Sequence, residues 1–403
     1  AITWNGGSAP TLLSANSYSL TGQVFNLVTA DGGTTWYGYE EVNNDSSQPH
    51  TLFAWGSNSY APLGQNNRTQ YSSPVQIPGT TWKTVNNSGD SRFVAMAQKV
   101  DNTLWMWGYN DFGLLGQNNT TDLSSPVQVP GTTWSDAFRS EYYASTAVKT
   151  DGTLWIWGSN GYGTVGQNNT VQYSSPVQIP GTTWPTNIEK LGSGYASSII
   201  IKTDGTLWTW GNNAKGQLGQ NNVDVHRSSP VQVPGTTWNL VESSGASTLA
   251  IKTDGTLWTW GNAQWGILGQ NNPYQTLLSS PTQIPGTTWK GGGVGENFMT
   301  ATKTDGTLWS WGYGLNGALG QNSAVIVSSP VQIPGTSWDV VDSGGEHTIA
   351  TKTDGTLWAW GDNENGELGV NNIARYSSPI QIPGSWAKIN ASRSFSFGLQ
   401  STS

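Results

Sequence analysis

The chain has 403 residues, of which only 10% are charged, while tryptophan occurs 23 times and glycine 51 times. This aromatic-rich, charge-poor composition excludes a disordered chain, and the absence of cysteine excludes disulfides and cysteine-ligated metals. A net charge of −8 argues against a nucleic-acid surface, and no apolar run is long enough for membrane insertion.

Residues 1–47 lie outside the pattern that organises the rest of the chain. Apolar and polar residues alternate from position 25 to 38 around an Asp-Gly-Gly turn at 31–33, which predicts a β-hairpin. With the Trp-Asn-Gly-Gly run at 4–7, this stretch resembles β-segments of phage tail-fibre and other virion proteins. The segment is therefore expected to be a docking extension, or alternatively a hairpin that covers an edge of the following domain. The candidate docking residues are Trp4, Trp36 and Tyr37.

From residue 48 onward, a repeat of about fifty residues organises the chain. Its marker is Trp-x-Trp-Gly, with Phe53 replacing the first tryptophan of one copy, and the second tryptophan recurs every 49 to 53 residues. Each copy continues through Ser-Ser-Pro to Pro-Gly-Thr-Thr-Trp or a near variant, so three markers agree on seven repeats. The second tryptophans are Trp55, Trp107, Trp157, Trp210, Trp260, Trp311 and Trp360.

Each repeat has the local chemistry of antiparallel strands. Asp254-Gly255 separates two short alternating runs, and Asp-Gly favours the tight turn of a hairpin. Trp258 and Trp260 share one face of their strand, which predicts that this face is buried against a neighbouring unit. Seven such units predict an all-β fold, a seven-bladed β-propeller. The alternative is an open β-solenoid with atypical capping repeats.

The two ends of the repeat region favour the closed ring. Residues 51–55 form a strand that lacks its hairpin partner, and residues 394–400 form a partner that lacks its Trp-x-Trp continuation. Together they complete one blade. We therefore predict a propeller over residues 48–403, closed by pairing of its N- and C-terminal strands, with residues 1–47 as a short N-terminal β-hairpin extension.

The run Trp-Gly-Asn-Asn-Ala-Lys-Gly-Gln-Leu-Gly at 210–219 resembles the regulator of chromosome condensation repeat family, and the resemblance extends over roughly residues 48–403. It implies a seven-bladed propeller with one blade shared by both termini. The founding member of that family exchanges nucleotide on a small nuclear GTPase and docks on chromatin. This chain is acidic and has only 17 Lys plus Arg, so a chromatin role is not expected.

The loops between Gln-Asn-Asn and Ser-Ser-Pro differ from repeat to repeat, and in a propeller they form one ring. Their tyrosines suit a protein or glycan partner, although the same side chains could simply cover the blade beneath. The Gln-Asn-Asn steps could bind sugar hydroxyls, but capping of turns is the favoured interpretation. The candidate binding residues are Tyr71, Leu123, Tyr173, His226, Arg227, Tyr274 and Tyr376.

No catalytic site, metal or cofactor is predicted. The recurring aspartates, such as Asp254, are explained as turn residues, and the acidic run at 362–367 resembles a calcium loop in one repeat only. The Gly-rich run at 291–295 lacks the Lys-Ser/Thr of a phosphate loop. The chain is therefore expected not to be an enzyme.

Three functional hypotheses remain. The first is a structural or adhesion protein of a virus particle, such as a phage tail or appendage component, with other virion proteins as partners. The second is a secreted or cell-surface bacterial propeller that binds glycan or protein. The third is an intracellular regulator of a small GTPase. The first two place the chain in a virion or outside the cell; the sequence predicts no oligomeric state.

Overall fold

The computed structural model describes residues 49–87 and 93–400 with their side chains, and four N-terminal strands and Ser401 as backbone. The chain divides into two compact units, residues 1–46 and 47–403. In the first unit the strands form an antiparallel sheet in chain order, and its third and fourth strands make the predicted hairpin. These strands are β1 (Thr11–Ser14), β2 (Ser17–Leu20), β3 (Gln23–Thr29) and β4 (Trp36–Glu40).

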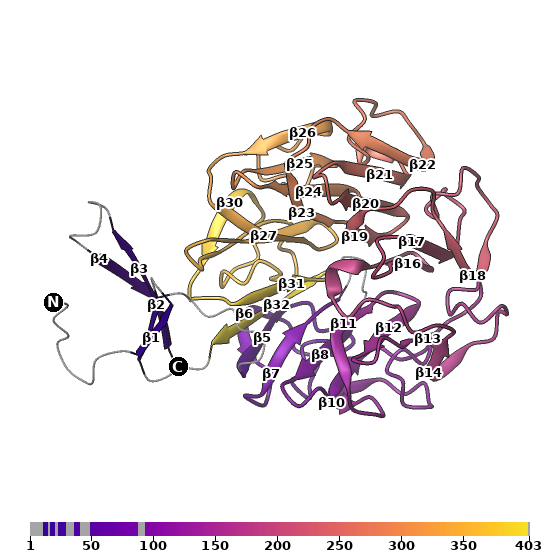
Figure 1. The fold of residues 1–403 in the computed structure, drawn as a ribbon, viewed down its shortest axis with the longest axis horizontal. Helices are drawn as coiled ribbons and strands as arrows, with labels where there is room; N and C mark the ends of the chain where they lie inside the picture. The colour runs from indigo at the N-terminus through magenta and orange to yellow at the C-terminus, as the bar shows by residue number, and fades with distance from the viewer. Residues whose placement is uncertain are drawn as a thin grey trace. The chain divides into compact units, whose positions relative to one another are not determined.

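The second unit is a seven-bladed propeller in its described residues, and each blade is a sheet of four antiparallel strands. Blade 1 is β31-β32-β5-β6, blade 2 is β7–β10, and blades 3 to 7 follow in groups of four from β11 to β30. One residue pair, His50 opposite Trp82, joins blades 1 and 2 into a continuous sheet. Figure 1 shows the colour running round the ring from indigo to yellow.

The first strands of most neighbouring blades contact one another, so they surround the axis. They are β7 (Trp82–Val85), β11 (Trp134–Ser140), β15 (Leu191–Gly194), β19 (Trp238–Ser244), β23 (Trp289–Val294), β27 (Trp338–Ser343) and β31 (Lys388–Ala391). The second strands are β8 (Val94–Lys99), β12 (Ala144–Lys149), β16 (Ser197–Ile201), β20 (Ser247–Lys252), β24 (Phe298–Lys303), β28 (His347–Lys352) and β32 (Phe395–Ser401).

The third strands carry Trp-x-Trp-Gly or its variant, and the fourth strands, which carry Ser-Ser-Pro, lie at the rim (Figure 1). The third strands are β9 (Leu104–Gly108), β13 (Leu154–Gly158), β17 (Leu207–Gly211), β21 (Leu257–Asn262), β25 (Leu308–Gly312), β29 (Leu357–Gly361) and β5 (His50–Gly56). The fourth strands are β10 (Leu123–Gln128), β14 (Tyr173–Ile179), β18 (Arg227–Gln232), β22 (Leu277–Ile284), β26 (Val327–Ile333), β30 (Tyr376–Ile382) and β6 (Tyr71–Gln76). Two short 3-10 helices are η1 (Ile188–Lys190) and η2 (Gln264–Gly266).

The Asp-Gly turn between second and third strands is a hydrogen-bonded unit. In blade 5 the Asp254 carboxylate accepts from the Thr256 N–H at 3.0 Å and from its hydroxyl at 2.7 Å. The Thr256 hydroxyl accepts in turn from the Trp258 indole at 2.9 Å. Lys252 places its Nζ 4.5 Å from the centre of the Trp258 ring, a cation–π contact. The recurring aspartates are thus turn residues, as the sequence predicts.

The core lies between blades, and the second tryptophan of each repeat connects them. Its indole N–H donates to a carbonyl in the third-to-fourth-strand loop of the preceding blade, at 2.6 to 2.9 Å in all seven blades. Trp260, for example, bonds the carbonyl of Gln217 and is fully buried. Trp55 of blade 1 bonds the Glu367 carbonyl of blade 7, so the set of bonds closes on itself.

The same closure is present in the backbone. β32 pairs with β5 from Phe395 opposite Gly56 to Ser401 opposite His50. Phe395, Phe397 and Leu399 of β32 are fully buried. The predicted sharing of one blade by both ends of the repeat region is therefore confirmed, and an open solenoid is excluded.

The Gln-Asn-Asn and Ser-Ser-Pro motifs form a latch between blades. In every blade the first Asn of the motif, or its counterpart, has a φ of 53° to 59°. Its N–H donates to the first Ser carbonyl of the next blade at 2.7 to 2.9 Å. The residues that donate are Asn66, Asn118, Asn168, Asn221, Asn271, Asn322 and Asn371. These asparagines therefore link neighbouring blades, and capping of the turn comes from the residue that follows, as where Asn67 Oδ1 accepts from the Thr69 N–H at 2.8 Å.

Replacing Asn221 separates two contributions to this latch. Asn221 has a φ of 56°, and its Oδ1 accepts from the Ser280 hydroxyl at 3.2 Å. Asn221→Ala is expected to lower the free energy of unfolding by about 2 kcal/mol, because it places a Cβ in left-handed backbone and removes the hydrogen bond. Asn221→Gly is expected to cost about 1 kcal/mol, since glycine tolerates that backbone. Urea unfolding measures both; equal losses would contradict the role of the backbone.

Candidate binding face

Two sets of loops emerge at one end of the ring, because consecutive strands of each blade are antiparallel. One set joins first to second strands and the other, longer set joins third to fourth strands. We call this end the loop face. The longer loops contain or adjoin every candidate binding residue predicted from the propeller sequence.

Five of these candidates occupy one equivalent position in five blades. Each stands at the start of a fourth strand, opposite the glycine that ends the third strand. They are Tyr71, Leu123, Tyr173, Arg227 and Tyr376.

The three tyrosines in this position are half-buried and pack on the blade cores. Their hydroxyls accept from Asn67, Asn169 and Asn372 at 3.1 to 3.3 Å. They therefore cover the blade beneath them, and a further role in binding stays a prediction.

The remaining candidates are spread around the ring. His226 accepts the Asn213 N–H at 3.0 Å through Nδ1, and its ring lies 5.0 Å from Tyr162. Tyr274 is 91% exposed, but Leu278 takes the equivalent position in its blade. Trp4 lies outside the described residues; Trp36 and Tyr37 lie in β4, whose side chains are also outside them.

Sequence reasoning missed a continuous row of aromatic side chains on the loop face. Neighbouring ring centres along it lie 4.4 to 6.3 Å apart, and it passes from blade 1 to blade 4. All of its members are at least partly exposed. We call it the aromatic arc; its residues are Tyr60, Phe93, Tyr109, Phe112, Tyr142, Tyr143 and Tyr195.

A signal for the arc is present in the repeat, at the third x of Trp-Gly-x-Asn-x-x-Gly, directly before the last glycine. That position is not needed for the fold, since polar residues fill it in three blades (Lys215, Asn316 and Asn365). The other four blades have aromatic residues there: Tyr60, Phe112, Tyr162 and Trp265. An aromatic residue at a position that the repeat leaves free indicates a contact surface.

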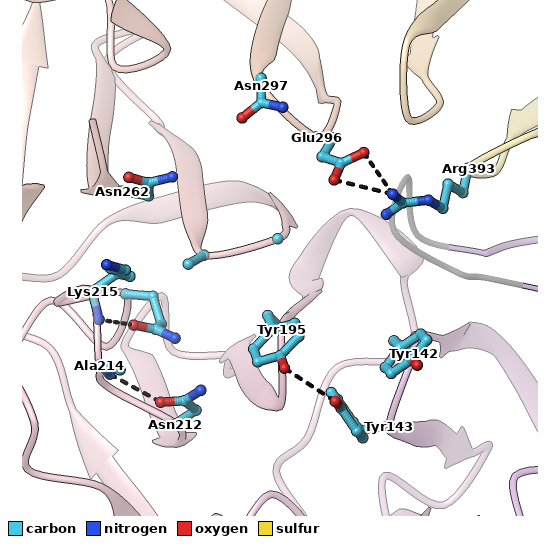
Figure 2. A pocket seen from close by; sticks show the side chains of 13 residues that line it. Tyr142, Tyr143, Tyr195, Asn212, Ala214, Lys215, Asn262, Glu296, Asn297 and Arg393 are labelled. Carbon is cyan, nitrogen blue, oxygen red and sulfur yellow. Dashed lines mark hydrogen bonds and ion pairs between the residues drawn. The ribbon is translucent and has the colours of Figure 1, made fainter. Parts of the chain in front are cut away.

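A pocket of about 380 Å³ opens near the centre of the loop face, at the end of the arc. Figure 2 shows Tyr143 and Tyr195 joined through their hydroxyls, 3.1 Å apart, with Tyr142 beside them. Glu296 and Arg393 form an ion pair at 3.0 Å elsewhere in the lining (Figure 2). Burial and the Tyr195 hydroxyl raise the pKa of Tyr143 well above its ordinary value, so the phenol stays neutral.

Charged side chains on the first strands lie around the axis. Arg139 of β11 reaches Glu242 of β19, two blades away, with Nη2 3.0 Å from Oε1. The Asp342 carboxylate of β27 accepts from the Ala391 N–H and the Asn390 amide of β31, both at 2.9 Å. Burial and the nearby Glu242 raise the pKa of Asp342 to about 7. These bonds link different blades, and the charged groups concerned already have hydrogen-bond partners within the protein.

Within residues 49–87 and 93–400, no group of three or more His, Asp or Glu side chains is placed to hold a metal ion. In the same described residues, no helix is both long and apolar enough to cross a membrane.

The fold and its loop face define a propeller of the regulator-of-chromosome-condensation type. Residues 51–402 match the model of the RCC1-like domain, and the chain belongs to that family. Among curated proteins it is similar to human E3 ubiquitin-protein ligase HERC2, with 26% identity over 179 residues. That match covers 43% of this chain and 4% of HERC2, so the chain corresponds to a small part of that relative.

Solved structures agree on the fold. Prp20p of Saccharomyces cerevisiae superposes with a TM-score of 0.77 at 19% identity, over 87% of this chain and 91% of that one. Yeast RCC1 (Prp20) bound to Kap60 gives 0.79 at 19% identity, over 93% and 96% of the two chains. Human WBSCR16 gives 0.76 at 19% identity, over 88% and 99%. The Prp20p structure is described together with its binding to Gsp1p and histones.

Proposed function

We propose that this chain is a non-enzymatic binding scaffold that holds a protein partner on its loop face through the aromatic arc. The arc supports this proposal because aromatic side chains dominate the energetics of protein interfaces. Its residues come from four blades, and one of them, Tyr195, is 39% exposed. The second tryptophans of the repeats, in contrast, are fully buried in the core.

The related propellers give a second line of support. Kap60 is bound to yeast RCC1, and Prp20p binds Gsp1p and histones. A protein partner for this chain is therefore the expectation that best matches both the family and the arc. Regulation of a small GTPase and a place in a virus particle or at a cell surface stay predictions, as does glycan recognition by the ring of third-to-fourth-strand loops.

The double variant Tyr60→Asn/Phe112→Asn tests the arc without disturbing the fold, since Asn316 and Asn365 occupy the same repeat position in blades 6 and 7. A partner is isolated by affinity capture on the full chain, and its Kd is then measured by titration calorimetry. Loss of two interface aromatics is expected to weaken binding at least about 30-fold.

Tyr274→Ser serves as the matched control, because Tyr274 is exposed on the same face but lies outside the arc. It is expected to leave the Kd unchanged. Partners that bind the double variant as tightly as the unmodified chain would overturn the proposal, and a loss confined to Tyr274→Ser would move the site to the ring of loops.

A further inference from the structure

The central pocket has an aromatic wall and a size suited to a small polar ligand. Tyr142 and Tyr143 lie edge-to-face with ring centres 4.4 Å apart, and Tyr143 and Tyr195 do so at 5.1 Å. Its volume of about 380 Å³ falls within the range of small-molecule sites, which combine apolar walls with a few placed polar groups. The apolar face of a sugar ring can lie against such a wall.

Gln217 supplies a donor that has no partner. The residue lines the pocket, is 1% exposed, and accepts the Lys215 N–H through Oε1 at 2.8 Å. Its Nε2 is buried without any hydrogen-bond partner. Buried donors normally have a partner, and this one belongs to a residue that lines the pocket, so Gln217 Nε2 is a candidate donor to a ligand oxygen. The fold does not require this amide, since Leu114 and Ile267 stand at the equivalent position in blades 2 and 5.

The pocket also carries one uncompensated positive charge. Lys215 is exposed, and no ion pair of its side chain occurs among the described residues. Glu296 and Arg393, in contrast, neutralise each other. Asn212, Asn262 and Asn297 also line the pocket, and an amide can both donate to and accept from hydroxyls. One cation with several amides suits a carboxylate and hydroxyls better than a phosphate, which calls for several charged or backbone donors.

We infer that the pocket at the centre of the loop face binds a carboxylated saccharide unit of the uronic-acid class. The sugar ring lies against the tyrosine wall, its carboxylate pairs with the Lys215 ammonium, and an oxygen accepts from Gln217 Nε2. This inference goes beyond the proposed protein scaffold and does not depend on it.

Ligand-observed NMR titration of the full chain with glucuronic acid and with glucose tests this directly, because the two sugars differ only at C6, which is a carboxylate in the first and a hydroxymethyl group in the second. Glucuronic acid is expected to bind about fivefold more tightly than glucose, the contribution of one exposed ion pair. Lys215→Asn, which copies Asn316 of blade 6, is expected to bring the ratio of the two affinities to about one. Absence of binding by either sugar, or a preference that survives this substitution, would overturn the inference.

Gln217→Glu is the sharper variant, because Glu367 occupies the equivalent position in blade 7 and likewise accepts a backbone N–H, that of Asn365, at 2.7 Å. The substitution keeps that turn while replacing the free donor by an acceptor. Glucuronic acid binding is expected to fall about tenfold or more through repulsion and the lost hydrogen bond. Glu367→Gln, the reverse change outside the pocket, is expected to leave it unchanged. Equal affinities for all three proteins would contradict the role of Gln217.

Two further measurements distinguish a glycan chain from a free sugar as the ligand, and the central pocket from the aromatic arc as the site. A glucuronate-containing tetrasaccharide that binds about tenfold more tightly than the monosaccharide would assign the pocket to a glycan chain, and equal affinities would assign it to a free sugar. The variant Tyr60→Asn, at the far end of the arc, is expected to keep sugar binding intact. If it abolishes sugar binding, the pocket is not an independent site, and the inference fails in that form.

Discussion

Trp260→Ala is expected to lower the free energy of unfolding by about 4 kcal/mol, the range of large core truncations. Trp260 is fully buried between blades 4 and 5, and its ring centre lies 6.0 Å from that of Trp238. The substitution opens a cavity and leaves the buried carbonyl of Gln217 without its donor at 2.9 Å. Chemical denaturation followed by tryptophan fluorescence measures the loss.

Trp258→Phe provides the matched comparison within the same strand. Trp258 is half-buried, and its indole donates to the Thr256 hydroxyl of its own turn rather than to another blade. The chain itself has phenylalanine at the equivalent position in blade 1, where the ring centre of Phe53 lies 5.8 Å from that of Trp386. Trp258→Phe is therefore expected to cost only about 1 kcal/mol. Similar losses for the two variants would contradict the assignment of inter-blade cohesion to the second tryptophan.

Removal of residues 394–403 is expected to abolish cooperative folding of the propeller. The deletion takes away β32, whose Phe395, Phe397 and Leu399 are fully buried. Burial of three such side chains contributes roughly 5–8 kcal/mol, which is comparable to the whole stability of many domains. The truncated chain would also expose the edges of β5 and β31, which favours aggregation.

Near-ultraviolet circular dichroism and size-exclusion chromatography measure the loss of folding that follows removal of residues 394–403. A synthetic peptide of residues 394–401 is expected to restore the native signal. Gly398→Val is the graded version, because a Cβ there would lie 2.4 Å from Cε3 and Cζ3 of Trp386. Overpacking of this kind is expected to cost about 1–3 kcal/mol while folding remains cooperative. A truncated chain that still unfolds in one sharp transition would show that the ring does not need closure by β32.

Most of the architecture follows from local signals. Asp-Gly turns, strand alternation and the Trp-x-Trp-Gly motif each involve only a few neighbouring residues, and they recur from repeat to repeat. The incomplete strands at 51–55 and 394–400 also indicate closure, because each lacks the partner that the other supplies. Turn type and side-chain alternation depend on neighbouring residues, so both can be predicted from the sequence without the tertiary structure.

The candidate site follows a different rule. Tyr71, Tyr173 and Tyr376 look like contact residues in the sequence, but each hydroxyl accepts from an asparagine four residues earlier and each ring covers its own blade. The arc was missed because no single repeat contains it: Tyr60, Tyr143 and Tyr195, for example, come from three different blades.

Local sequence patterns are thus enough to predict the number of blades, the strand and turn pattern within each blade, and the closure of the ring. Which residues act together is visible only in the folded chain: the tryptophan that bonds the preceding blade, the Asn–Ser latch, the aromatic arc and the central pocket. The physical reason is that ring closure brings loops from different blades within contact distance, although they are some fifty residues apart in sequence. Contacts across that separation depend on blade packing, which no local pattern encodes.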